Sequence, residues 1–317
     1  MRNPKQKAKS LPKLILLFAS ISAIVFPAVV HGKIVGDDNT IGLWHMDEVI
    51  PTEYRETIYD ATEMNPGTLI PAPTSPVLVE GKFGNALKFD GNNGVYVPIR
   101  FIVGFPPSPE PIYIPISTSL DVQKDIRVEA WINVQAFKEA SYNNVVVKCT
   151  RRDSSSENVT RIFGLAIKPA LKQNDRSIQD GILSGCVFTD TEGFNEIVTK
   201  EAVIPLNEWV HIAFTRSVTT GMHLYVNGIE KAAAAIYGTQ NPKGSIINGT
   251  EVYFGHDSIA VIDEIRISNL SPESETVMAE IDIGPNMLAA LIGVTVILSV
   301  ALILRKAIQM WAIRPKP

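Results

Sequence analysis

Residues 126–134 read Ile-Arg-Val-Glu-Ala-Trp-Ile-Asn-Val, and residues 208–216 read Glu-Trp-Val-His-Ile-Ala-Phe-Thr-Arg. In both stretches apolar and polar residues alternate, and β-branched and aromatic residues are frequent. This period of two is typical of half-buried β-strands. We expect three aromatic side chains to point into the core: Trp131, Trp209 and Phe214. Three polar side chains should point the other way: Arg127, Glu129 and His211.

Further short runs of the same composition occur between these stretches and on either side of them. They cover residues 95–97, 144–148, 162–167, 181–188, 222–226, 252–255 and 260–267. No long pattern with a period of 3.6 occurs before the C-terminal apolar segment. Many short strands without helices indicate an all-β fold, here a two-sheet antiparallel β-sandwich of the jelly-roll type.

One hairpin can be placed from its turn. Asn227-Gly228 separates residues 222–226 from residues 229–232. A type I′ turn needs a positive φ at both central residues, and Asn-Gly meets this requirement at low steric cost. The two flanking segments are therefore predicted to be neighbouring strands.

The N-terminus has the order of a secretory signal peptide. Basic residues lie between Arg2 and Lys13, an apolar run extends from Leu14 to Val30, and Gly32 provides a small residue for cleavage. We therefore assign residues 1–32 to a signal peptide. An uncleaved anchor is the alternative, because the apolar run is about long enough to span a membrane.

The C-terminus predicts a single membrane span. Residues 283–304 contain no charged residue, and Arg305 and Lys306 follow directly. Basic residues stay on the cytoplasmic side, which favours a transmembrane helix at 285–306 over a buried core helix. The predicted organisation is a domain at 33–275, a linker at 276–284, the helix, and a cytoplasmic tail at 307–317. The chain is then a single-pass protein of the cell membrane with its N-terminal domain outside.

Charge and cysteine content exclude some functions and leave others open. The net charge of −4 over 317 residues gives no concentrated basic face, so we expect no nucleic-acid partner. The two cysteines, Cys149 and Cys186, form no redox or metal motif. An exported domain permits a disulfide. A third predicted strand lies between them, however, and the pairing stays open.

Several segments, in order, resemble the laminin G-like modules of the concanavalin A-like lectin/glucanase jelly rolls. Residues 81–91, Gly-Lys-Phe-Gly-Asn-Ala-Leu-Lys-Phe-Asp-Gly, match the family segment Gly-Lys-x-Gly-x-Ala-Leu-x-Phe-Asp-Gly. The other matching segments are residues 41–48, 59–69, 119–122, 127–132, 208–213, 224–228 and 262–268. The resemblance covers about residues 41–270 and implies the same fold.

The resemblance also implies a structural calcium site that ties the loop after the first strand to the last strand. The candidate ligands are Asp60, Asn65, Thr68 and Asp263. Calcium prefers carboxylate and carbonyl oxygens. Asp263 lies in an otherwise apolar strand, where a buried carboxylate needs a partner or an ion. A hydrogen-bonded structural aspartate is the alternative for this position.

Residues 98–119 depart from the family pattern as a proline-rich insertion, predicted to be an edge or a loop. This insertion is either a loop that binds a ligand or a segment that only packs across the sandwich, and the sequence leaves both alternatives open. Four loop aromatics are the candidates for stacking on a ligand: Phe101, Phe105, Tyr113 and Tyr142.

No catalytic pattern is found. There is no closely spaced carboxylate motif of the glucanase type, no zinc spacing among the histidines, and no nucleophile motif. We therefore predict a non-enzymatic binding module on the cell surface, with a carbohydrate or glycosylated partner. The alternatives are an adhesion or structural protein that binds protein, and a glycosidase-like enzyme.

Overall fold

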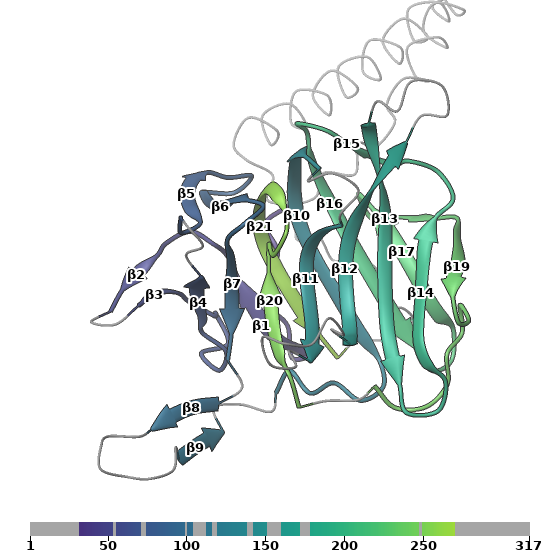
Figure 1. The fold of residues 1–317 in the computed structure, drawn as a ribbon, viewed down its shortest axis with the longest axis horizontal. Helices are drawn as coiled ribbons and strands as arrows, with labels where there is room; N and C mark the ends of the chain where they lie inside the picture. The colour runs from purple at the N-terminus through teal and green to yellow at the C-terminus, as the bar shows by residue number, and fades with distance from the viewer. Residues whose placement is uncertain are drawn as a thin grey trace, which may run out of the picture.

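The computed structural model describes residues 32–52, 55–70, 74–98, 100–103, 112–115, 119–137, 142–150, 160–171, 178–246 and 249–269. Within these ranges every regular element is a β-strand, which confirms the predicted all-β fold (Figure 1). No helix in this part of the chain is long and apolar enough to cross a membrane. The predicted signal peptide and transmembrane helix lie outside the described residues.

Eight strands form the first sheet, called sheet A. They are β1 (Thr40–Trp44), β5 (Val77–Glu80), β6 (Asn85–Asp90), β10 (Ile126–Ala136), β16 (Trp209–Ser217), β17 (Gly221–Val226), β18 (Ile229–Lys231) and β21 (Ile259–Ser268). Their order is β18-β17-β16-β10-β21-β6-β5, and all pairs are antiparallel. Along the edge of β21 opposite β10, β6 pairs with residues 259–262 and β1 pairs with residues 265–268.

Eleven strands form the second sheet, called sheet B. They are β2 (Ile50–Pro51), β3 (Glu56–Ile58), β4 (Gly67–Ile70), β7 (Gly94–Val97), β11 (Asn143–Thr150), β12 (Thr160–Leu171), β13 (Ile178–Thr189), β14 (Gly193–Thr199), β15 (Ile204–Pro205), β19 (Ala233–Tyr237) and β20 (Glu251–Phe254). Their order is β19-β14-β13-β12-β11-β20-β7-β4-β3-β2, with β15 beside β13. In Figure 1, strands β11 to β14 of sheet B lie in front of β16 and β17 of sheet A.

The proline-rich insertion contributes a separate two-stranded sheet. β8 (Arg100–Val103) and β9 (Ile112–Pro115) pair only with each other. Figure 1 shows this pair standing apart from the two large sheets. Short strands that belong to neither large sheet agree with the prediction that this proline-rich stretch is an edge or a loop.

The core lies between the two sheets. Trp44 is fully buried there and packs edge-on against Phe254, with 4.7 Å between ring centroids. Phe89, Phe163 and Phe214 are also fully buried in this cluster. Aromatic side chains of this size contribute much of the apolar area that stabilises a sandwich.

The prediction of inward-pointing aromatics is confirmed for Phe214 and wrong for Trp131 and Trp209. Trp131 packs with Ile34 and Leu43 on the outer face of sheet A, and Trp209 packs against this second cluster. On β10 the inward positions are taken by Val128, Ala130 and Ile132, all fully buried. Because alternate residues of a strand face opposite sides, Trp131 must share the outer face with Arg127 and Glu129.

The predicted hairpin is confirmed. Val226 pairs with Ile229, and the two residues between them, Asn227 and Gly228, have φ values of 49° and 69°. Both angles lie in the left-handed region that a type I′ turn requires.

Two cations are buried within the sandwich and hold loops in place. Lys148 is fully buried, and its ammonium group donates to the carbonyl oxygen of Leu120 at 2.8 Å and forms an ion pair with Asp121. The Arg216 guanidinium donates to three backbone carbonyls, of Lys124, Pro242 and Gly244. Buried charges need such partners, so both residues fix the loop segments at 120–124 and 242–244.

Candidate functional site

The Asp60 carboxylate organises the loop that follows β1. Its Oδ1 accepts hydrogen bonds from the N–H groups of Leu43 (2.9 Å) and Thr62 (3.0 Å). Its Oδ2 accepts from Thr62 Oγ1 (2.6 Å) and from the N–H of Asn65 (2.8 Å). Both oxygens therefore face donors, whereas a calcium ligand must turn a lone pair toward the ion. This arrangement fits a structural aspartate.

Asn65 is the second predicted ligand, and its side chain also stabilises this loop through hydrogen bonds. Its Nδ2 donates to the carbonyl oxygen of Ile41 at 2.8 Å, and its Oδ1 accepts from Ser119 Oγ at 3.0 Å. Thr68 lies on β4, between β3 and β7 of sheet B. The structure thus joins Asn65 to Asp60 but places Thr68 within a strand ladder.

Asp263 lies on β21 and is fully buried. Its Oδ2 accepts hydrogen bonds from the N–H groups of Lys82 (2.9 Å) and Phe83 (3.0 Å), while its buried Oδ1 has no partner among the described residues. Burial raises the pKa of Asp263 to about 7, against the hydrogen bond from Phe83, and the charge of Glu264 raises it further. The carboxylate therefore holds the turn before β6, as a hydrogen-bonded aspartate would.

The contacts of the four predicted ligands do not bring them together around one calcium ion. Asp263 contacts the turn at residues 82–83, not the loop at residues 60–65. Within the described ranges, no group of three or more His, Cys, Asp or Glu side chains is placed to hold a metal ion. Calcium stays a prediction, and melting the protein with and without a chelator tests it. A melting temperature that chelator leaves unchanged would contradict it.

Three of the four predicted ligand-stacking aromatics belong to the insertion. Phe101 lies on β8 and Tyr113 on β9, where Tyr113 pairs with Ile102. Phe105 falls outside the described residues. The backbone of the insertion thus brings Phe101 and Tyr113 into one small sheet.

Tyr142, the fourth, lies at the outer face of sheet B in a polar cluster. Its ring stacks under the Arg161 guanidinium, 4.9 Å from the centroid, and under the Lys168 ammonium at 5.6 Å. Burial raises the pKa of the Tyr142 phenol, and the charge and hydrogen bond of Glu196 raise it further. Glu196 is 2 % exposed and also accepts from Ser184 Oγ at 2.6 Å. The cluster holds an oriented carboxylate beside an aromatic ring.

Glu196 belongs to a continuous row of residues that crosses the outer face of sheet B from strand to strand. Each member is the direct register partner of the next. In order they are Tyr96, Tyr253, Val147, Gly164, Cys186, Glu196 and Tyr237. Directly opposite residues in neighbouring strands point to the same face, so all seven lie on one face of the sheet. Tyr237 is exposed there, whereas Tyr253, Val147, Cys186 and Glu196 are buried.

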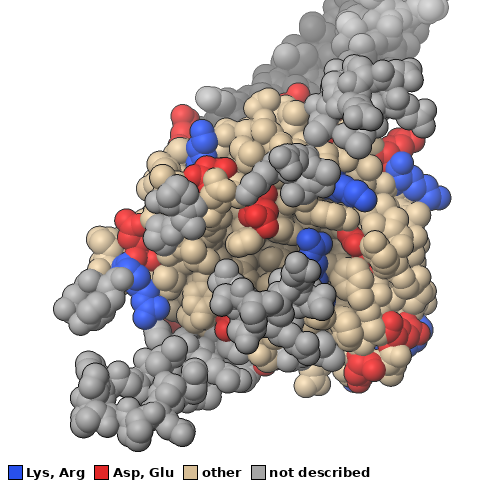
Figure 2. Space-filling view, viewed as in Figure 1, with Lys and Arg blue, Asp and Glu red and all other residues tan. Residues whose placement is uncertain are grey.

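Large side chains stand at both ends of this row and small ones lie in the middle. Tyr96 and Tyr253 have ring centroids 5.6 Å apart, and at the other end Tyr237 lies 5.9 Å from Phe194. Between them Gly164 has no side chain. Four strand spacings separate Tyr253 from Glu196, which is ~19 Å. Among the described residues, Figure 2 shows charged side chains scattered over this side of the molecule.

Cys149 and Cys186 also lie on this face, are buried, and are not joined by a disulfide. Cys149 lies on β11 and Cys186 on β13, and β12 lies between these strands. A strand between the two cysteines was also predicted from the sequence. Burial raises the pKa of the Cys186 thiol to about 12. A thiol held in its neutral form is a poor nucleophile, so Cys186 serves here as a small apolar side chain.

The outer face of sheet A carries a buried charge network. Glu129 Oε2 accepts from Arg127 Nη2 at 2.7 Å and lies 3.1 Å from His211 Nε2, while Oε1 pairs with Arg266. Burial opposes the charge of Glu129, but Arg127, His211 and Arg266 outweigh it and hold the pKa of Glu129 well below its usual value. The network joins β10, β16 and β21.

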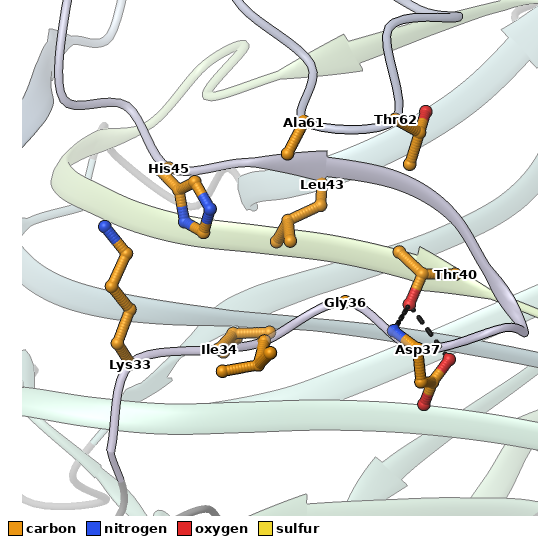
Figure 3. Close-up of a pocket in the computed structure, with 10 residues that line it drawn as sticks. Lys33, Ile34, Gly36, Asp37, Thr40, Leu43, His45, Ala61 and Thr62 are labelled. Carbon is orange, nitrogen blue, oxygen red and sulfur yellow. Dashed lines mark hydrogen bonds between the residues drawn. The ribbon is translucent and has the colours of Figure 1, made fainter. Parts of the chain in front are cut away.

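A cavity of about 790 Å³ lies beside this face, between the segment 33–37 and β1 (Figure 3). Its lining residues are Lys33, Ile34, Val35, Gly36, Asp37, Thr40, Leu43, His45, Ala61 and Thr62. At one end Lys33 Nζ lies 2.9 Å from Asp47 Oδ2, and His45 Nδ1 lies 2.8 Å from Glu264 Oε2. Lys33 is therefore already paired with a carboxylate, and the His45 ring already has a hydrogen-bond partner, at this end of the cavity.

Sequence reasoning identified only Tyr142 among the residues of the sheet B surface. Tyr96 and Tyr253 lie in strands that were predicted from the sequence. Their positions alternate with those of core residues, and this alternation could have identified them as residues of the outer face. Glu196 gave no signal of its own, because its neighbours come from distant parts of the chain.

Comparison with known proteins gives a family and several similar folds. Residues 111–278 match the concanavalin A-like lectin/glucanases superfamily. Curated proteins include no match. Among solved structures, the binding domain of Paraclostridial Mosquitocidal Protein 1 is 15% identical, with a TM-score of 0.47, and the alignment covers 74% of this chain and 49% of that chain.

Two further solved structures are similar. Domain 4 of AbnA, a GH43 extracellular arabinanase from Geobacillus stearothermophilus, in complex with arabinotriose, is 16% identical with a TM-score of 0.44, over 74% of this chain and 95% of that one. The receptor binding domain of botulinum neurotoxin mosaic serotype C/D is 13% identical with a TM-score of 0.47, over 78% and 51%. The chain spans about half the length of the two toxin domains. Since the family match covers more than half of the sequence, this chain belongs to the concanavalin A-like lectin/glucanases superfamily.

Proposed function

We propose that the domain is a non-catalytic carbohydrate-binding module that holds an oligosaccharide across the outer face of sheet B. The observation that carries this proposal is the row from Tyr96 to Glu196 and Tyr237, with aromatic rings at both ends and an oriented carboxylate at one. Membership of a lectin and glucanase superfamily supports the same class of ligand.

The chemistry of the row suits a sugar. The exposed ring of Tyr237 offers a flat apolar surface with a polar edge. Ligand sites combine such surfaces with a few placed polar groups that set orientation. Glu196 is 2 % exposed and is held by Ser184 and Tyr142, so its remaining acceptor capacity suits a single sugar hydroxyl group.

Binding is favoured over hydrolysis by the number of acids in the row. Glycosidases use two carboxyl groups on either side of the scissile bond. Along the described row from Tyr96 to Tyr237, Glu196 is the one carboxylate. A single carboxylate can orient a hydroxyl group but does not supply both the acid and the base.

Replacing Glu196 by Gln should weaken glycan binding by about 10- to 100-fold, since a hydrogen bond to a charged group contributes about 1.5–3 kcal/mol. The measurement is titration of the strongest hit from an array of neutral and acidic oligosaccharides. Glu230→Gln on β18 is the matched control, because Glu230 pairs with His223 on the other sheet. Equal affinity of the Glu196→Gln protein and the wild type would remove the proposed surface.

The insertion gives a competing surface that the same assay separates. Phe105→Ala and Tyr113→Ala should leave affinity unchanged if sheet B binds the glycan. Loss of binding in these variants, with normal binding by Glu196→Gln, would assign the ligand to the insertion. A protein without any hit on the array would favour the adhesion alternative, in which the partner is a protein.

We also propose that the domain is displayed outside the cell, held by the apolar segment at residues 285–306. The uncharged run and the basic residues directly after it support this placement. Protease added to intact cells should remove the domain and leave a small C-terminal fragment in the membrane. Protection of the domain in intact cells would contradict the placement.

A further inference from the structure

Two cations lie beside one aromatic ring on the outer face of sheet B. The Arg161 guanidinium is 4.9 Å from the centroid of the Tyr142 ring, and the Lys168 ammonium is 5.6 Å from it. Both cations are carried by β12, at partly exposed positions. An aromatic ring attracts a cation to its face but carries no net charge. The ring therefore holds both cations close together without neutralising either of them.

Neither cation is neutralised by the described acids of this face. Three acids share the face with them: Glu196, Glu251 and Asp180. Within the described ranges, no ion pair joins any of the three to Arg161 or Lys168. Glu196 is buried and is already bound to neighbouring hydroxyl groups. Both cations are therefore available to an anionic ligand.

The Tyr142 side chain connects these cations to the carboxylate of the proposed glycan surface. Its ring lies beside the cations, and its hydroxyl group hydrogen-bonds to Glu196. Burial is the main cause of the raised pKa of the Cys186 thiol. The charge of Arg161 lowers this pKa and that of Glu196 raises it, so both groups lie near Cys186. A cationic donor and a hydrogen-bond acceptor are thus available within one small area of sheet B.

We propose that the glycan held on this face is acidic, and that its anionic group binds Arg161 and Lys168 while one of its hydroxyl groups donates to Glu196. The inference rests on the proposed function, because it names the class of ligand for the same face. The planar guanidinium of Arg161 can donate two parallel hydrogen bonds to a carboxylate or sulfate group. The Lys168 ammonium adds a compact positive charge beside it. A neutral sugar would use only the acceptor at Glu196 and would leave both cations without a partner.

An array with matched ligands tests the class of sugar. The full-length protein in detergent is offered neutral, carboxylated and sulfated oligosaccharides, with each acidic one beside its methyl ester or its desulfated form. Binding should be confined to acidic sugars and should fall by at least about tenfold on esterification or desulfation. It should also weaken between about 0.05 and 0.5 M NaCl, because salt screens exposed charges. The acidic class that binds identifies the anion as a carboxylate or a sulfate. Hits that are all neutral would overturn this inference and leave the proposed function standing, whereas an array without any hit would remove both.

Variants of the two cations test their individual contributions. Arg161→Gln should weaken binding of the acidic ligand by about 10- to 100-fold, the usual loss for a hydrogen bond to a charged group. Lys168→Gln should weaken it by up to about fivefold, since an exposed point charge contributes less. Lys88→Gln on β6 removes the same charge from an exposed position of sheet A. This variant is the matched control and should bind like the wild type.

The neutral counterpart of the ligand separates recognition of the anion from support of the Tyr142 ring. If Arg161 only holds the ring in place, Arg161→Gln should weaken the acidic ligand and its neutral counterpart by the same factor. If Arg161 binds the anion, only the affinity for the acidic ligand falls. Equal losses for the two ligands, or wild-type affinity of both Gln variants for the acidic ligand, would overturn the proposal. Glu196→Gln should lower the affinity for both ligands, so it tests the proposed function separately.

Discussion

Replacing Glu129 by Ala is expected to lower the free energy of unfolding by about 3–5 kcal/mol, the usual cost of removing one partner of a buried ion pair. Glu129 is 2 % exposed and contacts the guanidinium groups of Arg127 and Arg266. Without the carboxylate, two cations remain close together on a covered face. The measurement is urea denaturation of both proteins, with the midpoint and slope compared.

An exposed pair gives the control for this prediction. Glu230 lies 2.8 Å from His223 and its side chain is 56% exposed, so Glu230→Gln should cost less than about 1 kcal/mol. The depressed pKa of Glu129 adds a pH signature. Its stabilisation is present above the pKa of the unfolded chain and is lost as pH falls through the lower folded pKa. A loss below 1 kcal/mol in Glu129→Ala would show that the network contributes little.

Replacing Asp263 by Asn should make stability less dependent on pH between about 4 and 7. The folded pKa is raised to about 7 from the usual 3.8. Between these values the unfolded chain ionises while the folded chain keeps its proton, so wild-type stability falls as pH rises and levels off above 7. Asparagine does not titrate, and its oxygen can still accept from Lys82 and Phe83. Relative to the wild type, the free energy of unfolding of the variant should rise by about 1–3 kcal/mol between pH 4 and pH 8.

The comparison is made by thermal melting across this pH range. Asp38→Asn, at an exposed turn, is the matched control and should follow the wild-type curve in parallel. Parallel curves for Asp263→Asn as well would mean that Asp263 ionises normally in the folded protein.

Strand positions were predictable because local alternation determines them, but the assignment of faces was less secure. For β10 the prediction that Glu129 points outward was correct, and the prediction that Trp131 points into the main core was wrong. The error came from the assumption that large aromatic residues point into the main core. Sheet A is apolar on both faces near Trp131, because Ile34 of the N-terminal segment covers it. A strand buried on both sides no longer shows from its own sequence which face is inside.

The proposed binding surface was harder to predict because it depends on strand order. Tyr96, Tyr253 and Glu196 come to lie in one row only through the order of six strands, and pairing between distant segments leaves no local pattern. β19 was missed for another reason: alanine is depleted in strands, so Ala233–Tyr237 did not read as one. Tyr142 was found because it is an aromatic residue in a polar stretch.

The pairing of β1 with β21 has a mechanical consequence. The first and last strands of the domain are direct neighbours, and the N–H of Asn269 donates to the carbonyl oxygen of Asn39 at 3.0 Å. The polypeptide therefore enters and leaves the domain at one point. A tether at either end would therefore attach to the same side of the domain. A pulling force on that tether would act on the hydrogen bonds between β1 and β21 before it reached any other part of the fold.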